Sequence, residues 1–301
     1  MKVQRLSDLG GVSVEGVDLA IPKTPEESRA LKGLLDEHGL VVFRNQNLTK
    51  RQLVEAGAPF GGAMLNKVTV APDPEAVGIS VVSTRGVDGD VMPDDPDKLV
   101  GQADWHTDQG YLVQPNRGKI LYAVQIPEEG GQTGFIDGQT TYATLPPDLR
   151  EQIEGLHVIQ SWRHSRREDD GGQQYRRNGA VELARDRFED VVYPIVYPHP
   201  VTGANVLNYP PLWAAGILEM SGSAAEALHA RIMAHIVQPK FQYWHKYSPG
   251  DAVMWDNWRF LHSAGGTPGR YARTLWSMAI VAGPILGLTT EQAAALKQNA
   301  A

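Results

Sequence analysis

The stretch AVMWDNWRFLHSAGGTPGRYARTLWSMAIVAG, residues 252–283, decides the fold class. It opens with an apolar segment of strand type, AVMWDN (252–257), and closes with another, TLWSMAIVAG (274–283). The residues between them are rich in glycine and include a proline, as turns between strands are. The stretch therefore predicts two strands, with His262 just after the first and Arg273 at the head of the second.

Similar strand-like segments occur upstream of this stretch. They are ISVVS from Ile79, KILYAVQI from Lys119, VVYPIVYP from Val191, NVLNYP from Asn205 and FQYWHKY from Phe241. Turn-forming residues separate them, for example Ser248-Pro249-Gly250-Asp251. Many short strands separated by such turns predict a mainly β protein with an antiparallel sandwich or barrel.

Helices are predicted to flank this β core. Thr24, Thr49 and Ser223 are each followed three residues later by Glu or Gln, which is the pattern of a helix-starting capping box. The first helix should end near Gly39, and the wholly apolar run 40–43 should follow it as a strand. We therefore expect a mainly β fold with flanking helices.

Length and composition limit the possible functions. The chain has 301 residues, 42% of them hydrophobic, and we expect one domain over residues 1–301. The net charge of −7 argues against nucleic-acid and anionic-membrane partners. No apolar run reaches the ~20 residues of a membrane span, and the first residues lack a signal-peptide pattern, so we expect a soluble, cytoplasmic protein. Because there is no cysteine, any metal must be held by histidine and carboxylate.

One segment combines such ligands. Trp105-His106-Thr107-Asp108 places a histidine and a carboxylate two residues apart, on the same side of an extended backbone. A surface turn in which Asp108 caps a backbone amide is the alternative. With His262 as a third ligand, two histidines and a carboxylate leave adjacent positions open, as in iron(II) oxygenases. A zinc hydrolase could use the same ligands, but no separate general base has a recognisable spacing.

Three motifs occur in an order that resembles a known family. They are WHTD (105–108), GGQTGFIDGQTTYATLP (130–146) and WDNWRFLH (255–262), the last followed by an arginine. Together they resemble the taurine dioxygenase and chlorophenoxyacetate dioxygenase (TauD/TfdA) family of Fe(II)- and 2-oxoglutarate-dependent dioxygenases. The resemblance runs from LVVFRNQNLT (40–49) to the strand TLWSMAIVAG. It implies a double-stranded β-helix, or jelly-roll, cupin-like core with helices packed outside.

The resemblance also implies roles for individual residues. His106, Asp108 and His262 match the iron ligands, and Arg273 and Thr133 match the residues that bind 2-oxoglutarate. A guanidinium suits that role because it offers two parallel donors to a carboxylate. The implied reaction hydroxylates a C–H bond of a small organic acid with O₂ and releases succinate and CO₂.

The substrate contacts implied by the family are only partly matched. Sulfonate-using relatives carry a second arginine four residues after the co-substrate arginine, and this chain has Ser277 there. Lys67, with Gln102 near it, is the predicted replacement. We therefore expect taurine to be a poor substrate and a carboxylate with an aromatic or other bulky apolar group, such as an aryloxyalkanoate, to be preferred. Lys67→Ala should then raise the substrate KM and leave the 2-oxoglutarate KM nearly unchanged.

A different class of function remains open at this point. A non-catalytic jelly-roll binding protein would share the fold, but it would be expected to have lost at least one member of the set His106, Asp108, His262 and Arg273. The intact set favours the enzyme. We also expect a homo-oligomer, because dimers and larger assemblies are common among similar enzymes.

Overall fold

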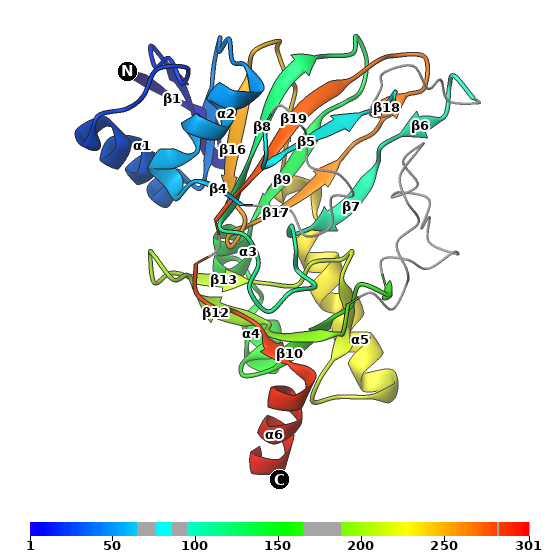
Figure 1. Ribbon diagram of the computed structural model, residues 1–301. Helices are drawn as coiled ribbons and strands as arrows, with labels where there is room; N and C mark the ends of the chain where they lie inside the picture. The colour runs from blue at the N-terminus through cyan, green and yellow to red at the C-terminus, as the bar shows by residue number, and fades with distance from the viewer. Residues whose placement is uncertain (65–75, 86–94, 165–187, 282, 301) are drawn as a thin grey trace.

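The computed structural model describes residues 1–64, 76–85, 95–164, 188–281 and 283–300. Two β-sheets face each other in the upper half of Figure 1, and a smaller sheet lies below them with the helix α5 (Gly222–Ile236) beside it. The helices α1 (Pro25–His38) and α2 (Lys50–Ala56) cover one side of the upper half. The mainly β jelly-roll core with flanking helices is as predicted.

The larger of the two facing sheets holds strands from both ends of the chain. Its order is β1 (Lys2–Ser7), β2 (Gly10–Glu15), β3 (Leu40–Phe43), β16 (Ala252–Asp256), β8 (Gly118–Gln125), β19 (Thr274–Ile280) and β4 (Ala63–Met64), with β5 (Ile79–Ser83) also paired with β19. Its neighbouring strands are antiparallel except β2 and β3, which are parallel. The predicted strands at both ends of the stretch 252–283 therefore lie on either side of β8.

The smaller facing sheet carries the histidine motifs. Its order is β15 (Gln242–His245), β9 (Thr133–Asp137), β17 (Phe260–Ala264) and β7 (Ala103–His106), and all its pairs are antiparallel. In this register His262 lies opposite His106 on one side and opposite Phe135 on the other. Directly opposed residues present their side chains on the same face. The two histidines therefore share one face of the sheet.

Apolar side chains fill the space between the two sheets. The larger sheet contributes Leu121, Ala123, Val253, Trp255 and Leu275, and the smaller sheet contributes Phe135 and Phe260. Because successive side chains of a strand point to opposite faces, the intervening residues face outward. On the larger sheet they pack against α1 and α2, and on the smaller sheet they pack against α4 (Pro147–Ile153) and α5.

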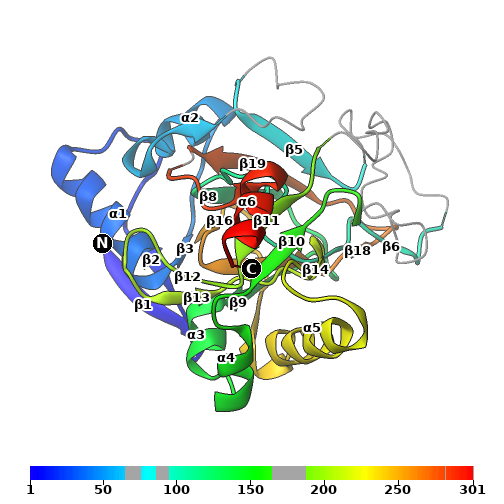
Figure 2. The same ribbon diagram turned by 90° about the horizontal axis from the view of Figure 1, so that it is seen from below.

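The remaining elements surround this core, as the view from below in Figure 2 shows. They are η1 (Ala58–Phe60), β6 (Leu99–Val100), α3 (Gly138–Ala143), β10 (His157–Gln160), β11 (Val191–Pro194), β12 (Val196–Pro198), β13 (Asn205–Leu207), β14 (Ala214–Ile217), η4 (Pro239–Phe241), β18 (Thr267–Pro268), β20 (Leu288–Thr289) and α6 (Thr290–Ala300). The strands β14, β10, β11 and β20 form a third sheet in that order, while β12 pairs with β13 and β18 with β6. None of the helices in the described ranges combines the length and apolarity needed to cross a membrane.

The predicted helix starts hold in two of three cases. α1 and α2 begin after Thr24 and Thr49, each with a complete capping box, and α1 ends at Gly39 in the left-handed conformation. The predicted start at Ser223 is wrong, because α5 already begins at Gly222 and its N-cap residue makes no side-chain capping hydrogen bond. Ser223 is thus the second residue of the helix, two positions too late to act as its N-cap.

Candidate active site

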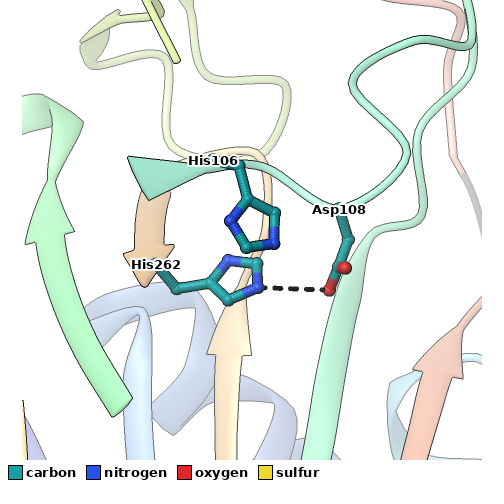
Figure 3. A group of neighbouring side chains, drawn as sticks. All are labelled: His106, Asp108 and His262. Atoms are coloured by element: carbon teal, nitrogen blue, oxygen red, sulfur yellow. Dashed lines mark ion pairs between the residues drawn. The ribbon is translucent and has the colours of Figure 1, made fainter. Parts of the chain in front are cut away.

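Three potential metal ligands converge at the end of the smaller sheet. His106 is the last residue of β7, His262 lies in the middle of β17, and Asp108 follows β7 by two residues. The two imidazole rings are 4.1 Å apart between centroids, and His262 Nε2 lies 3.6 Å from Asp108 Oδ2. One ligand atom from each of the three residues lies within 4.8 Å of the others (Figure 3). This spacing suits coordination of a single ion.

Both histidines are held in the form that binds a metal. His106 Nδ1 is 2.6 Å from the Asp104 carbonyl oxygen, to which it donates, so Nε2 remains free. Burial lowers the pKa of His106. Burial, reinforced by the neighbouring His106 ring, also holds the pKa of His262 well below its usual value. Neutral imidazoles at pH 7 follow, as metal coordination requires.

Asp108 is the anionic member of the cluster. Its carboxylate oxygens Oδ1 and Oδ2 lie 2.9 and 2.8 Å from the Lys119 Nζ. Burial alone would raise the pKa of Asp108, but the ion pair with Lys119, helped by smaller contributions from His262 and His106, outweighs burial and lowers that pKa far below its usual value. The carboxylate is therefore ionised at physiological pH. Lys119 was not among the residues predicted from the sequence, although a charged residue at an inward position of an apolar strand was the available signal.

Asn257 positions the backbone of Asp108. The Asp108 N–H donates to Asn257 Oδ1 at 2.8 Å, and Asn257 Nδ2 donates to the Asp108 carbonyl oxygen at 2.9 Å. The same Nδ2 lies 3.1 Å from the Asn116 carbonyl oxygen. Two residues earlier, Trp255 packs against the His262 ring with centroids 4.7 Å apart. The Trp-Asp-Asn tripeptide thus supports two of the three candidate ligands.

The middle residue of that tripeptide belongs to a buried ion-pair network. Asp256 pairs with Arg117, and its Oδ2 lies 2.9 Å from His199 Nε2. Burial would raise the pKa of Asp256, but His199 and Arg117 together lower it. This network anchors the connection between β16 and β17, next to the candidate ligands.

Arg273 and Thr133 lie at a second polar site in the core. Arg273 directly precedes β19, is 7% exposed, and its Nε has no hydrogen-bond partner among the described residues. Burial lowers the pKa of this guanidinium. Its central carbon lies 5.7 Å from the centre of the Tyr247 ring, and the Tyr247 hydroxyl is 2.9 Å from Thr133 Oγ1. In the described ranges this buried guanidinium has no acidic partner, and such an arrangement is expected of an anion-binding site.

Tyr247 and Gly131 were missed as site residues by the sequence analysis. Tyr247 links the Thr133 hydroxyl to Arg273, and only the tertiary structure shows this contact. Gly131 has a φ of +74°, and a Cβ at this position would lie 3.0 Å from Arg273 Cδ. Glycine is required here because the backbone has a positive φ and because Arg273 approaches too closely for a side chain.

The three predicted substrate residues are placed differently. Ser277 is buried in β19, two residues after the core residue Leu275, so both side chains point to the same face. Gln102 is exposed, precedes β7, and packs its side chain over Gly266. Lys67 lies outside the described residues.

An aromatic cluster borders His106. Tyr111 packs against Trp162, Phe188 and Trp213 with centroid distances of 4.8, 4.7 and 5.1 Å. The Trp213 ring is 6.1 Å from the His106 ring, and its Nε1 donates to the Thr107 carbonyl oxygen at 2.7 Å. The cluster thus forms an apolar wall on one side of the candidate metal ligands.

The amino-acid sequence is similar to one protein family and to several characterised members of it. The family model described as "Taurine catabolism dioxygenase TauD, TfdA family" matches residues 3–279. The alpha-ketoglutarate-dependent 2,4-dichlorophenoxyacetate dioxygenase of Cupriavidus pinatubonensis is 29% identical over 263 residues, which cover 85% of this chain and 89% of that one. The (S)-phenoxypropionate/alpha-ketoglutarate-dioxygenase of Sphingobium herbicidovorans is 30% identical, over 82% of this chain and 84% of that one.

Solved structures show the same similarity in three dimensions. The crystal structure of AAD-2 in complex with Mn(II) and N-oxalylglycine matches with a TM-score of 0.75 and 25% identity, and it covers 95% of this chain and 98% of that one. A taurine dioxygenase from Burkholderia xenovorans has the same fold, with a TM-score of 0.75 over 97% of this chain and 92% of that one, at 24% identity. Since the family match spans almost the whole length, the chain belongs to the TauD/TfdA family and is a dioxygenase that depends on Fe(II), 2-oxoglutarate and O₂.

Proposed function

We propose that this enzyme hydroxylates a C–H bond of a small organic acid that carries an aromatic or other bulky apolar group, and that it releases succinate and CO₂. The observation that carries the proposal is the aromatic cluster around Tyr111, which lies directly beside the candidate ligand His106. Two relatives named for aryloxyalkanoates support the same substrate class. Sulfonate-dioxygenase relatives are the competing class.

His106, Asp108 and His262 would hold the iron. Two neutral imidazoles and one carboxylate form the ligand set of iron(II) oxygenases, and the structure brings one donor atom from each together. Bound iron supplies the oxidising chemistry, and the protein orients the reactants. Asn257 holds the backbone of Asp108 in place, and Trp255 packs against the His262 ring.

Arg273 and Thr133 would bind the distal carboxylate of 2-oxoglutarate. The Arg273 guanidinium is buried and has no acidic partner among the described residues, and its planar fork fits a carboxylate. Thr133 lies two residues before Phe135, which is opposite His262, so the two sites are about 7 Å apart along β9. An extended five-carbon diacid can bridge such a spacing. Burial raises the pKa of Tyr247 to about 12, so its hydroxyl keeps its proton at neutral pH.

The first experiment tests the reaction class. The anaerobic protein is mixed with Fe(II) and 2-oxoglutarate, and the visible charge-transfer band of the chelated keto acid is recorded. We expect the band in the wild type and its loss in His262→Ala. A folded wild-type protein without the band would favour the alternative, a non-catalytic jelly-roll binding protein.

The second experiment tests the substrate class. Aryloxyalkanoates, other aromatic carboxylates and taurine are compared by substrate-dependent succinate release. We expect release with an aromatic carboxylate and little with taurine. Efficient turnover of taurine would contradict the proposed class.

Assembly and location are further parts of the proposal. We propose that residues 1–301 form one domain that assembles into a homo-oligomer in the cytoplasm. Light scattering should then give a mass that is a multiple of 32.9 kDa. A mass equal to that of a single chain would contradict the oligomer.

A further inference from the structure

Lys119 is a cation placed inside the core at the candidate metal site. It lies in β8, between its register partners Trp255 of β16 and Ala279 of β19. It alternates with the core residues Leu121 and Ala123, so its side chain points between the two sheets. A lysine is seldom buried unless it is paired. A lysine in the middle of the larger sheet is therefore expected to have a specific polar partner or ligand.

The contact with Asp108 uses only some of the N–H donors of the Lys119 ammonium group. Lys119 Nζ lies within hydrogen-bond distance of both Asp108 oxygens. An ammonium group has three N–H donors. The contact to Oδ1 is a hydrogen bond and the contact to Oδ2 is a close ion pair, so at least one donor has no partner among the described residues. The side chains of Lys119 and Asp108 are each 19% exposed, so the pair is not sealed in the core. Within the described part of the chain, a Lys119 donor is therefore available to a group that enters beside Asp108.

Charge balance indicates the sign of that group. The iron would bring two positive charges, and Lys119 and Arg273 bring one each. Asp108 brings one negative charge and 2-oxoglutarate two. Counted over these ligands and the described residues named, one positive charge is left over in a largely buried site, where an uncompensated charge is unfavourable. A substrate with one negative charge would neutralise it.

The neighbouring strand places a small, uncharged side chain near Lys119. Ser277 pairs with Leu121, two residues along β8 from Lys119, and both point to the interior. Its small, uncharged side chain adds no competing cation at this place. Arg273, at the head of the same strand, would be engaged by 2-oxoglutarate in the proposed function.

We propose that Lys119 binds the carboxylate of the primary substrate and so selects a small monoanion over a neutral molecule of the same shape. This inference rests on the proposed function, because it assigns the substrate contact of the same site. The Lys119 ammonium contacts Asp108 on one side and the substrate carboxylate on the other. Lys119 is thus a specificity-determining residue in addition to the metal and 2-oxoglutarate ligands.

The test compares an acid with its neutral analogue. The wild-type protein is loaded anaerobically with Fe(II) and 2-oxoglutarate, and binding of phenoxyacetate and of phenoxyacetamide is measured by calorimetry. We expect tighter binding of the acid. Lys119→Met should weaken phenoxyacetate binding about tenfold to hundredfold, the range of a hydrogen bond to a charged group, and leave phenoxyacetamide binding nearly unchanged.

Further variants separate charge from structure. Lys119→Gln keeps a hydrogen-bond donor for Asp108 without the charge, and it should also lose the preference for the acid. Lys50→Met is the matched control, because Lys50 lies over the Trp276 ring on the outer face of the same sheet. It should keep the wild-type preference. Lys67→Ala tests the lysine that the sequence analysis favoured for this role.

The outcomes distinguish this inference from the proposed function. If the wild type does not bind Fe(II) and 2-oxoglutarate, the proposed function itself fails. If loading is normal but the wild type shows no preference for the acid, or Lys119→Met and Lys119→Gln keep it, only the role of Lys119 is refuted. Equal weakening of acid and amide would show that Lys119 merely supports Asp108, and loss of the preference in Lys67→Ala alone would move the contact to Lys67.

Discussion

The structure predicts that Asn257 controls metal affinity without touching the metal. In Asn257→Ala the side-chain amide is lost, and with it the hydrogen bonds to the Asp108 N–H, the Asp108 carbonyl and the Asn116 carbonyl. Asn257 is 1% exposed, so water does not readily replace its amide. The segment that carries Asp108 would lose its connection to the end of β16.

Two effects of this substitution can be estimated. A buried polar group left without a partner costs about 1–3 kcal/mol. We expect the free energy of unfolding to fall by about 2–4 kcal/mol, since at least the Asp108 N–H is left unpaired. Loss of an outer contact that orients a metal ligand typically weakens metal affinity about tenfold to hundredfold. Both effects should appear in the same variant.

The assay measures these effects separately. Urea unfolding gives the change in stability, and titration with Mn(II), followed by electron paramagnetic resonance of the free ion, gives the metal affinity. Asn208→Ala is the matched control, because Asn208 is a buried asparagine whose Nδ2 contacts the Pro194 carbonyl oxygen instead. It should lose stability and keep the wild-type Mn(II) affinity. If Asn257→Ala also keeps that affinity, the reasoning that Asn257 positions the ligand is wrong.

Three further predictions concern the site and its support. Asp108→Ala should keep the fold but lose bound iron and hydroxylation together; full iron content with the parental rate would contradict the ligand assignment. Arg273→Lys should raise the 2-oxoglutarate KM about tenfold to hundredfold, because a point charge replaces a bidentate fork in a contact of roughly 1.5–3 kcal/mol; an unchanged KM would place the co-substrate elsewhere. Asp256→Asn should lower the free energy of unfolding by about 3–5 kcal/mol at pH 7, since Arg117 and His199 lose their buried carboxylate. Because the pKa of Asp256 is lowered from 3.8 in the folded protein, its contribution is present above that pH and is lost as the pH falls through the folded value. The stabilities of wild type and Asp256→Asn should therefore converge in acid, and a constant difference would refute the assignment.

Features that depend on neighbouring residues were predictable from the sequence. The capping boxes at Thr24 and Thr49 were confirmed because their hydrogen bonds join residues three positions apart. Strands such as β8 and β19 were located by apolar runs bounded by turn residues. The spacing of His106 and Asp108 likewise pointed to a shared ligand site, since two residues of an extended segment lie on one side of the backbone.

Two other strands could not be recognised because their composition is not typical of strands. β9 follows two glycines and contains a third, and β17 is a five-residue strand whose central residue is His262. His262 was predicted to follow a strand, whereas it lies within one, opposite His106 and Phe135. That register results from the pairing of three strands, and no local pattern specifies it.

The sequence by itself determined the fold class, the family and the set of candidate metal and co-substrate residues, because these depend on residue type and spacing along the chain. Only the tertiary structure decided what surrounds them. Lys119 reaches Asp108, Tyr247 joins Thr133 to Arg273, and Asn257 holds a backbone 149 residues away. These contacts form where separate strands and loops meet between the two sheets. Their geometry depends on strand order and register, and the pattern of residues along the chain does not specify either of them.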